Sequence, residues 1–196
     1  GNIIEKQETE HFFMDKYSIL KQYYGHSAFR AGQEELIDSI LSGRDALCVM
    51  PTGGGKSLCY QIPALLLPGI TLVVSPLISL MKDQVAALKS AGVPAAYINS
   101  SLTSEQIRTV YARTRKGAYK LIYVAPERLE TNSFLSLMQE MDVSFLAVDE
   151  AHCISQWGQD FRPSYLGIVD FINALPRRPI VAAYTATATK QVQSDI

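Results

Sequence analysis

The sequence has few cysteines and no long hydrophobic run. Its 196 residues include three cysteines, Cys48, Cys59 and Cys153, which lie far apart with no C-x-x-C spacing. This scarcity excludes a disulfide framework and a zinc-finger pattern, so we expect reduced, buried thiols. No apolar run approaches the ~18 residues that a membrane span requires. The segment 1–16 mixes acidic and basic residues and does not read as a secretory signal.

The sequence also has no large excess of charge of either sign. It contains 18 Lys and Arg against 19 Asp and Glu, for a formal net charge of −1. The chain is therefore not a generically basic nucleic-acid binder, and any such contact must come from a local surface. The hydrophobic fraction of 47% excludes intrinsic disorder and is ample for the core of one globular domain.

Six short apolar runs alternate with segments of helical periodicity, which is typical of a parallel sheet covered by helices on both faces. The sequence thus predicts one α/β domain over 43–196, preceded by a helical segment over 1–42. The predicted strands are 45–49, 71–75, 95–98, 120–124, 144–148 and 180–184. The predicted helices are 57–67, 77–91, 104–116, 132–141 and 165–174.

A glycine-rich turn follows the first predicted strand, with the sequence Met50-Pro51-Thr52-Gly53-Gly54-Gly55-Lys56-Ser57 before a helix. Backbone N–H groups of such a turn can point at phosphate oxygens, and the helix N-terminus adds partial positive charge. Lys56 supplies a cation for the β and γ phosphates, and the Ser57 hydroxyl suits Mg²⁺. Met50 stands where the usual pattern has its first Gly. The alternative is a merely flexible turn.

A second buried strand ends in the acidic pair Asp149-Glu150, followed by Ala151-His152. Asp149 is placed to hold Mg²⁺ through water, and Glu150 to orient or deprotonate an attacking water. The alternative is a solvated acidic pair after a strand.

Together, the phosphate loop and Asp-Glu-Ala-His resemble the superfamily 2 helicases, and the surrounding residues narrow the resemblance to the RecQ DNA helicases. It extends from Leu20 to Ile196 and implies a RecA-like P-loop NTPase fold, the first motor lobe. Besides these two motifs, it rests on the segments 29–33, 75–84, 125–129, 153–165 and 185–188, of which Gln156–Pro163 is the most specific to this family.

The resemblance also implies which residues recognise the nucleotide base. Gln33 matches the family glutamine that reads the adenine edge, and Arg30 matches its neighbouring arginine. His26 stands where the family often has a stacking Tyr, and Ala31 where it usually has Pro. Imidazole can stack with less surface, so we expect weaker base affinity with adenine selectivity kept. The alternatives are a polar residue at a helix start for Gln33 and a surface ion pair for Arg30.

Several further residues are expected to contact or sense DNA. The loop residues Trp157, Phe161 and Arg162 combine aromatic rings with a cation, as single-strand binding platforms do. A strand end and helix start at Ser75-Pro76 suit backbone phosphates, with Lys82 as an added cation. By resemblance, His152, Thr185 and Thr187 link the γ-phosphate site to DNA and to the other lobe. The alternatives are a minor core for the aromatic rings and helix capping for the threonines.

We therefore expect the ATP-binding lobe of an ATP-dependent DNA helicase, with ATP and Mg²⁺ as cofactors. The expected partners are single-stranded and forked DNA and a second helicase lobe, with no membrane contact. The expected location is the cytoplasmic nucleoid in a bacterium or the nucleus in a eukaryote. A P-loop kinase or a nucleotide-gated interaction module is the alternative. A kinase would need lid arginines and an acceptor pocket, and a non-catalytic module would not need Lys56, Ser57, Asp149 and Glu150.

Overall fold

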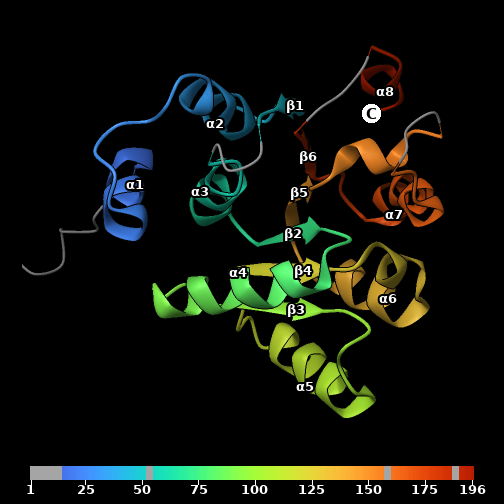
Figure 1. The fold of residues 1–196 in the computed structure, drawn as a ribbon. Helices are drawn as coiled ribbons and strands as arrows, with labels where there is room; N and C mark the ends of the chain where they lie inside the picture. The colour runs from blue at the N-terminus through green and yellow to red at the C-terminus, as the bar shows by residue number, and fades with distance from the viewer. Residues whose placement is uncertain (1–14, 52–54, 157–159, 187–189) are drawn as a thin grey trace, which may run out of the picture.

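A single all-parallel sheet organises the molecule (Figure 1). The computed structural model describes residues 15–51, 55–156, 160–186 and 190–196. The sheet in this part of the chain has six strands in the order β1-β6-β5-β2-β4-β3. The strands are β1 Ala46–Val49, β2 Ile70–Val74, β3 Ala95–Ile98, β4 Leu121–Val124, β5 Val143–Val148 and β6 Ile180–Thr185.

Helices connect the strands and cover both faces of the sheet. Figure 1 shows α1 to α3 on one side of the strands and α6 and α7 on the other. The α-helices are α1 Lys16–Tyr24, α2 Gln33–Leu41, α3 Leu58–Leu66, α4 Ile78–Ser90, α5 Ser104–Arg115, α6 Asn132–Glu140, α7 Gly167–Ala174 and α8 Lys190–Asp195. Short 3₁₀ turns are η1 Pro126–Glu130, η2 Ala151–Ile154 and η3 Pro163–Leu166.

Alternate residues of the central strands enter two separate cores, as the two-residue period of a strand requires. Val73 and Tyr123 face the core built with α1 to α4, whereas Leu72 and Ile122 face the core built with α5 to α7. Strand β2 is buried at every position. Burial on both faces is why the central strands are almost entirely apolar, and the α/β prediction with helices on both faces is confirmed.

The predicted elements match the observed ones to within a residue or two, because local signals mark most ends. Asp15 accepts a hydrogen bond from the Ser18 amide at the start of α1, and Gly25 ends that helix in the left-handed region. One boundary differs. The helix predicted over 165–174 begins as the 3₁₀ turn η3, led by Pro163, and becomes α-helical only at Gly167.

The three cysteines are buried and free, as expected. Burial raises the pKa of Cys48 and Cys153 to about 11 and that of Cys59 to about 12, so they are neutral thiols at physiological pH. None of the described helices combines the length and apolar character that crossing a bilayer requires.

Candidate nucleotide and DNA site

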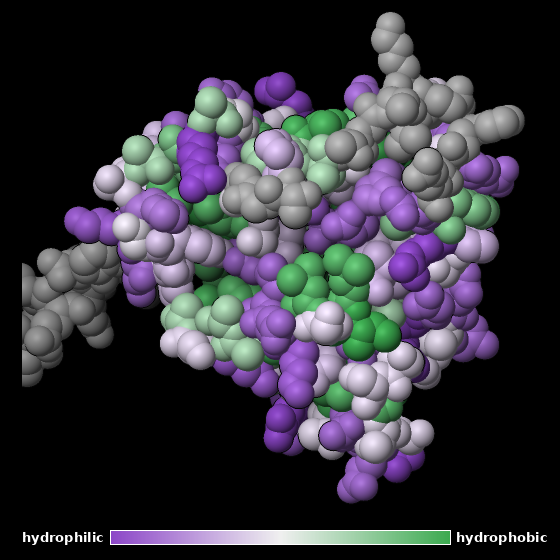
Figure 2. Space-filling model, in the orientation of Figure 1, coloured by the Kyte–Doolittle hydropathy of each residue, from purple (hydrophilic) through white to green (hydrophobic). Residues whose placement is uncertain are grey.

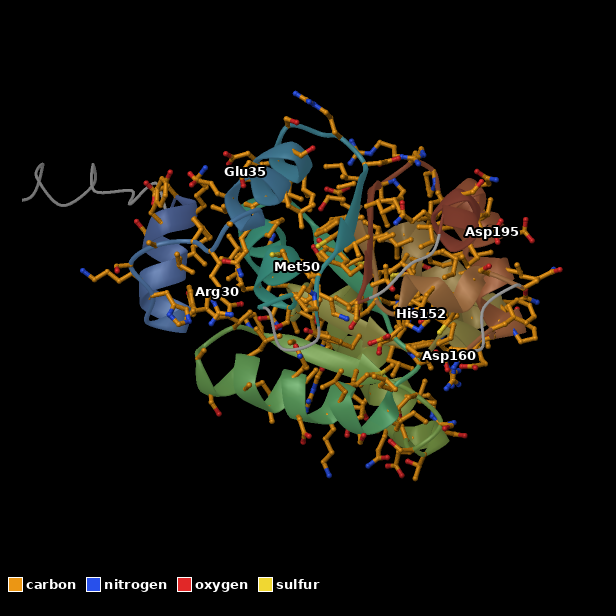
Figure 3. All side chains as sticks on the ribbon, turned by 45° about the horizontal axis from the view of Figure 1, so that its top comes forward. Arg30, Glu35, Met50, His152, Asp160 and Asp195 are labelled. Atoms are coloured by element: carbon orange, nitrogen blue, oxygen red, sulfur yellow. The ribbon has the colours of Figure 1, made fainter. Side chains whose placement is uncertain are left out.

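The predicted functional residues gather where the strands end. In a parallel sheet all carboxyl ends lie at one edge, so segments distant in sequence meet there. Met50 follows β1, Ser75 follows β2 and Asp149 follows β5. In Figure 3, Met50 lies between Arg30 on one side and His152 on the other, so the phosphate loop begins between the two ends of the predicted site.

Lys56 and Ser57 close the phosphate loop and open α3. Ser57 occupies the N-cap position without a side-chain capping bond, so its hydroxyl is not engaged in capping the helix. Gly55 has φ +78°, a left-handed conformation that glycine adopts without strain. Thr52, Gly53 and Gly54 lie outside the described residues.

The Lys56 ammonium joins the phosphate loop to the acidic pair. Its Nζ lies 2.8 Å from Asp149 Oδ1 and 3.4 Å from Glu150 Oε1. Burial alone would lower the pKa of Lys56, but the attraction of the Asp149 and Glu150 carboxylates is stronger, so the pKa is raised. Lys56 is therefore a permanent cation at this edge of the sheet, held where a phosphate would need it.

Backbone strain marks the acidic pair. Glu150 has φ 51° and ψ 43° and is the only non-glycine residue with positive φ in the described ranges. Such a conformation costs about 1–3 kcal/mol and persists only where the surroundings impose it. Asp149 Oδ1 accepts the Glu150 amide at 2.9 Å, and the buried Tyr165 hydroxyl donates to the Asp149 carbonyl at 2.8 Å. These bonds fix the turn that aims both carboxylates at Lys56.

His152 lies at the centre of contacts from three segments. Its Nε2 is 3.6 Å from both Glu150 Oε2 and Asp160 Oδ2, and its Nδ1 is 2.9 Å from the Thr185 hydroxyl. Figure 3 shows His152 and Asp160 next to each other at this end of the site. The imidazole thus contacts the acidic pair, the loop before α7 and the end of β6. Thr187 lies outside the described residues.

The predicted adenine motif begins α2 beside the phosphate loop. Gln33 is 2% exposed, and its side-chain carbonyl accepts the Arg30 amide at 2.8 Å. Its Nε2 lies 2.5 Å from the point that a Cβ on Gly55 would occupy, so the amide touches the loop. The side chains of His26 and Arg30 are exposed on the segment between α1 and α2. The structure therefore brings Gln33 to the phosphate loop and leaves the other two facing solvent.

A groove of about 310 Å³ runs along the same edge, beyond β2, β3 and β4. We call it the carboxyl-edge groove. Residues on its walls include Pro76, Ile78, Asn99, Arg128 and Arg162.

Figure 2 shows hydrophobic surface over the start of α4, where Leu77, Ile78 and Leu80 are exposed. Ser75 is 2% exposed. Its hydroxyl accepts a hydrogen bond from the Leu77 amide at 3.2 Å and shapes the turn into α4. Lys82 is exposed further along that helix and does not line the carboxyl-edge groove.

The predicted aromatic platform is described in part. Phe161 is half-buried, and Arg162 is exposed and reaches the carboxyl-edge groove. The Arg162 amide donates to the Cys153 carbonyl at 2.9 Å, which ties this segment to η2 directly after the acidic pair. Trp157 lies outside the described residues.

The arrangement is matched by a known family. Residues 30–195 match the DEAD/DEAH box helicase family. The chain belongs to the DEAD/DEAH box helicases. The matched range includes the phosphate loop, the acidic pair and the residues that line the carboxyl-edge groove.

Within the DEAD/DEAH box helicases, the chain is similar to RecQ proteins. It is 53% identical over 180 residues to the ATP-dependent DNA helicase RecQ of Bacillus subtilis, covering 91% of this chain and 30% of that protein. It is 54% identical over 179 residues to that of Haemophilus influenzae, covering 91% and 29%. The chain thus spans under a third of the length of these relatives, and the RecQ resemblance is confirmed.

Solved helicase structures share the fold of this DEAD/DEAH box domain. The helicase MrfA bound to DNA and AMPPNP has a TM-score of 0.72 at 16% identity, covering 93% of this chain and 27% of that one. The Hef helicase domain of Pyrococcus furiosus has a TM-score of 0.66 at 22% identity, covering 85% and 34%. At these identities the likeness establishes the RecA-like fold alone.

Most residues that line the carboxyl-edge groove, among them Asn99 and Arg128, were not among the predicted site residues. Asn99 follows β3 and Arg128 lies in η1 after β4, and both line the carboxyl-edge groove. The available signal was position: polar residues directly after parallel strands lie at the binding edge. Arg128 stood within a recognised family segment, whereas Asn99 had only its place after a short strand.

Replacing Gly55 should damage the site more than replacing a glycine of similar backbone conformation elsewhere. Gly55→Ala places a Cβ 2.5 Å from Gln33 Nε2 at φ +78°. Gly92→Ala is the control, because its φ is +87° and no heavy atom lies within 4 Å of the added Cβ. Both should lose about 1–2 kcal/mol of unfolding free energy from the left-handed backbone, measured by denaturant titration. Only Gly55→Ala should also weaken ATP binding; equal ATP affinity in both variants would contradict this role of the loop.

Proposed function

We propose that the chain is the first motor lobe of an ATP-dependent DNA helicase of the RecQ type. The contact of Lys56 with Asp149 and Glu150, at the edge that also carries the groove, supports this function best. A cation and two carboxylates beside a phosphate loop are the parts that nucleoside triphosphate hydrolysis needs. In the whole protein, hydrolysis would drive translocation on single strands and unwinding of forked duplexes.

Each residue of the nucleotide site has a distinct task in this proposal. Lys56 neutralises the β and γ phosphates, which displace it from the carboxylates. Glu150 accepts the proton of the attacking water, since it is the more exposed carboxylate of the pair. Gln33 reads adenine from its place against Gly55, with Arg30 and His26 at the open side.

The donors fit a Mg²⁺ ion held jointly with the nucleotide. The described residues contain no group of three or more His, Cys, Asp or Glu that could hold a metal ion. A Mg²⁺ ion bound to phosphates needs only one or two carboxylates and a hydroxyl from the protein. Asp149 and Ser57 supply these, and the ion would neutralise charge on the transferred phosphoryl group.

DNA would follow the carboxyl-edge groove. Arg128 and Arg162 provide cations for the backbone, and Pro76 and Ile78 provide apolar contact for bases or sugars. We propose Ser75, Lys82, Phe161 and Trp157 as further contacts. His152 contacts both Glu150 and Thr185, and with Thr187 it would relay nucleotide state to the second lobe. The site of action would be the nucleoid of a bacterium or the nucleus of a eukaryote.

The proposed activity is tested by measuring ATP hydrolysis by the full-length protein with and without single-stranded DNA. Stimulation by DNA supports a helicase motor. Stimulation by a small phosphate acceptor instead, with a phosphorylated product, would indicate a kinase. Binding of ATP without turnover under either condition would indicate a nucleotide-gated module.

Lys56→Ala should weaken ATP binding by about 2 kcal/mol or more, because the triphosphate loses a charge-assisted contact. This corresponds to a Kd about 30-fold higher or more, measured by calorimetry. Lys89→Ala is the control, since Lys89 is an exposed lysine in the last turn of α4. Unchanged ATP affinity in Lys56→Ala would refute this nucleotide site.

A further inference from the structure

A partly buried polar cluster lies between the two helices that lead away from the proposed nucleotide and DNA sites. Helix α3 begins directly after Ser57, and α4 begins with Ile78 at the carboxyl-edge groove. Between them, side chains from α1, α3, α4 and β4 form one hydrogen-bonded group. The members of this tyrosine–glutamine cluster are Tyr24, Tyr60, Gln61, Gln84 and Tyr123.

Gln84 of α4 is the hub of the tyrosine–glutamine cluster. Its carbonyl oxygen Oε1 lies 2.8 Å from Gln61 Nε2, 3.1 Å from the Tyr123 hydroxyl and 3.3 Å from the Tyr60 hydroxyl. Tyr60 and Gln61 belong to α3, so the carbonyl of one α4 side chain receives two neighbouring α3 side chains. Gln84 therefore fixes the position of α4 relative to α3 near Tyr60 and Gln61.

Gln61 has every polar group of its amide satisfied. Its Nε2 donates to Gln84 and, at 2.9 Å, to the Tyr123 hydroxyl, while its carbonyl accepts the Tyr24 hydroxyl. Its residue exposure is 5%, and those of Tyr60 and Tyr123 are 1% and 2%. These bonds favour one arrangement, because a shift that breaks them leaves a buried polar group of Gln61, Tyr60 or Tyr123 unpaired.

Apolar side chains of α3 and α4 belong to one core, among them Ile62 on α3 and Val85 on α4. A cavity of about 360 Å³ opens beside the tyrosine–glutamine cluster, lined by residues from Ser57 to Leu65 on the α3 side and from Leu80 to Ala91 on the α4 side. Three members of the cluster, Tyr24, Gln61 and Gln84, lie on the wall of this cavity. The hydrogen bonds from Tyr60 and Gln61 to Gln84 are direct polar links between the two helices next to the cavity.

We propose that Gln84 is a positioning residue that couples nucleotide binding at the phosphate loop to DNA binding at the start of α4. A displacement of α3, whose first residues follow Lys56 and Ser57, moves Gln61 and Tyr60. Their bonds to Gln84 carry the displacement to α4 and so to Pro76 and Ile78 in the carboxyl-edge groove. This inference rests on the proposed function, because it assigns the link between its two sites.

The test is a binding cycle in the full-length protein. The Kd of a non-hydrolysable ATP analogue is measured with and without saturating oligo-dT, and the Kd of oligo-dT with and without the analogue. The two ratios must agree, since coupling between binding sites is reciprocal, and typical values are about 5–150-fold. Gln84→Met keeps the length and volume of the side chain but removes the acceptor of all three contacts.

In Gln84→Met we expect both ratios to fall to within about twofold of 1, while the Kd of each ligand alone changes less than about threefold. Tyr123→Phe, which removes one hydroxyl, should lower the ratios in the same direction and is the second variant if Gln84→Met does not fold. The control is Thr114→Val, because Thr114 is a buried polar residue whose hydroxyl donates within α5, to the Val110 carbonyl at 2.7 Å. It should keep the unaltered ratios.

The binding measurements distinguish a failure of the Gln84 inference from a failure of the proposed function. Ratios that stay unaltered in a folded Gln84→Met or Tyr123→Phe protein would overturn the role of the tyrosine–glutamine cluster and leave the proposed function standing. The same holds if the unaltered protein binds both ligands with ratios of 1. If the unaltered protein binds neither ATP analogue nor oligo-dT, the proposed function fails, and this inference fails with it.

Discussion

If the proposed function is right, the 196-residue chain alone should hydrolyse ATP about 10³–10⁵-fold more slowly than a protein that also contains the second helicase lobe. The lobe supplies the phosphate loop, the acidic pair and Lys56, but in the proposed motor the arginine that neutralises transition-state charge comes from the second lobe. An arginine of this kind contributes about 4–7 kcal/mol to lowering the barrier. Turnover of both proteins at saturating ATP and single-stranded DNA gives the comparison.

The isolated lobe must bind nucleotide for this comparison to be meaningful. Calorimetry with a non-hydrolysable ATP analogue provides the control, because binding requires Lys56 and the loop but no second lobe. The chain alone should also unwind no duplex, since strand separation needs two lobes that open and close around nucleotide. Turnover by the isolated lobe within tenfold of the full-length rate would show that catalysis is complete within these residues.

Glu150→Gln should lower ATP turnover of the full-length protein by about 10²–10⁴-fold, the usual contribution of a general base. The amide keeps the size and hydrogen-bonding capacity of the side chain but cannot accept a proton from water. Lys56 stays paired with Asp149 at 2.8 Å, so the nucleotide site keeps its main cation and ATP binding should persist. Steady-state hydrolysis and analogue binding, measured on one preparation, separate the two effects.

Glu140→Gln is a matched control for Glu150→Gln. It removes one carboxylate charge at an exposed position whose contact is Arg115, 3.4 Å away and far from the phosphate loop in sequence. Its turnover should equal that of the unaltered protein. Near-normal turnover in Glu150→Gln would remove this carboxylate from the mechanism, and loss of ATP binding together with turnover would make its role structural.

The phosphate loop and the acidic pair could be predicted from the sequence because each follows a strand that the local pattern identifies. Continuous apolar runs predict strands buried on both faces, and glycine-rich or acidic residues directly after them indicate ligand contacts. The phosphate loop and the acidic pair were found in this way, and the Lys56–Asp149 contact of 2.8 Å agrees with that interpretation. The family segments added Gln33, which the structure places against Gly55.

Contacts between elements far apart in the chain were decided only by the tertiary structure. Strand order places β6 between β1 and β5, which brings Thr185 to His152, and it places β4 between β2 and β3, which brings Arg128 and Asn99 into one groove. No local period encodes this order, because it follows from how whole helices and strands pack.

The same holds for Gln84. In sequence it is one polar residue of an amphipathic helix, and only the packing of α3 against α4 and β4 makes it the shared acceptor of Tyr60, Gln61 and Tyr123. The sequence by itself thus determined the fold class and the chemical groups of the site. The tertiary structure decided which of those groups touch, because contact across a sheet depends on strand order and helix packing rather than on neighbours along the chain.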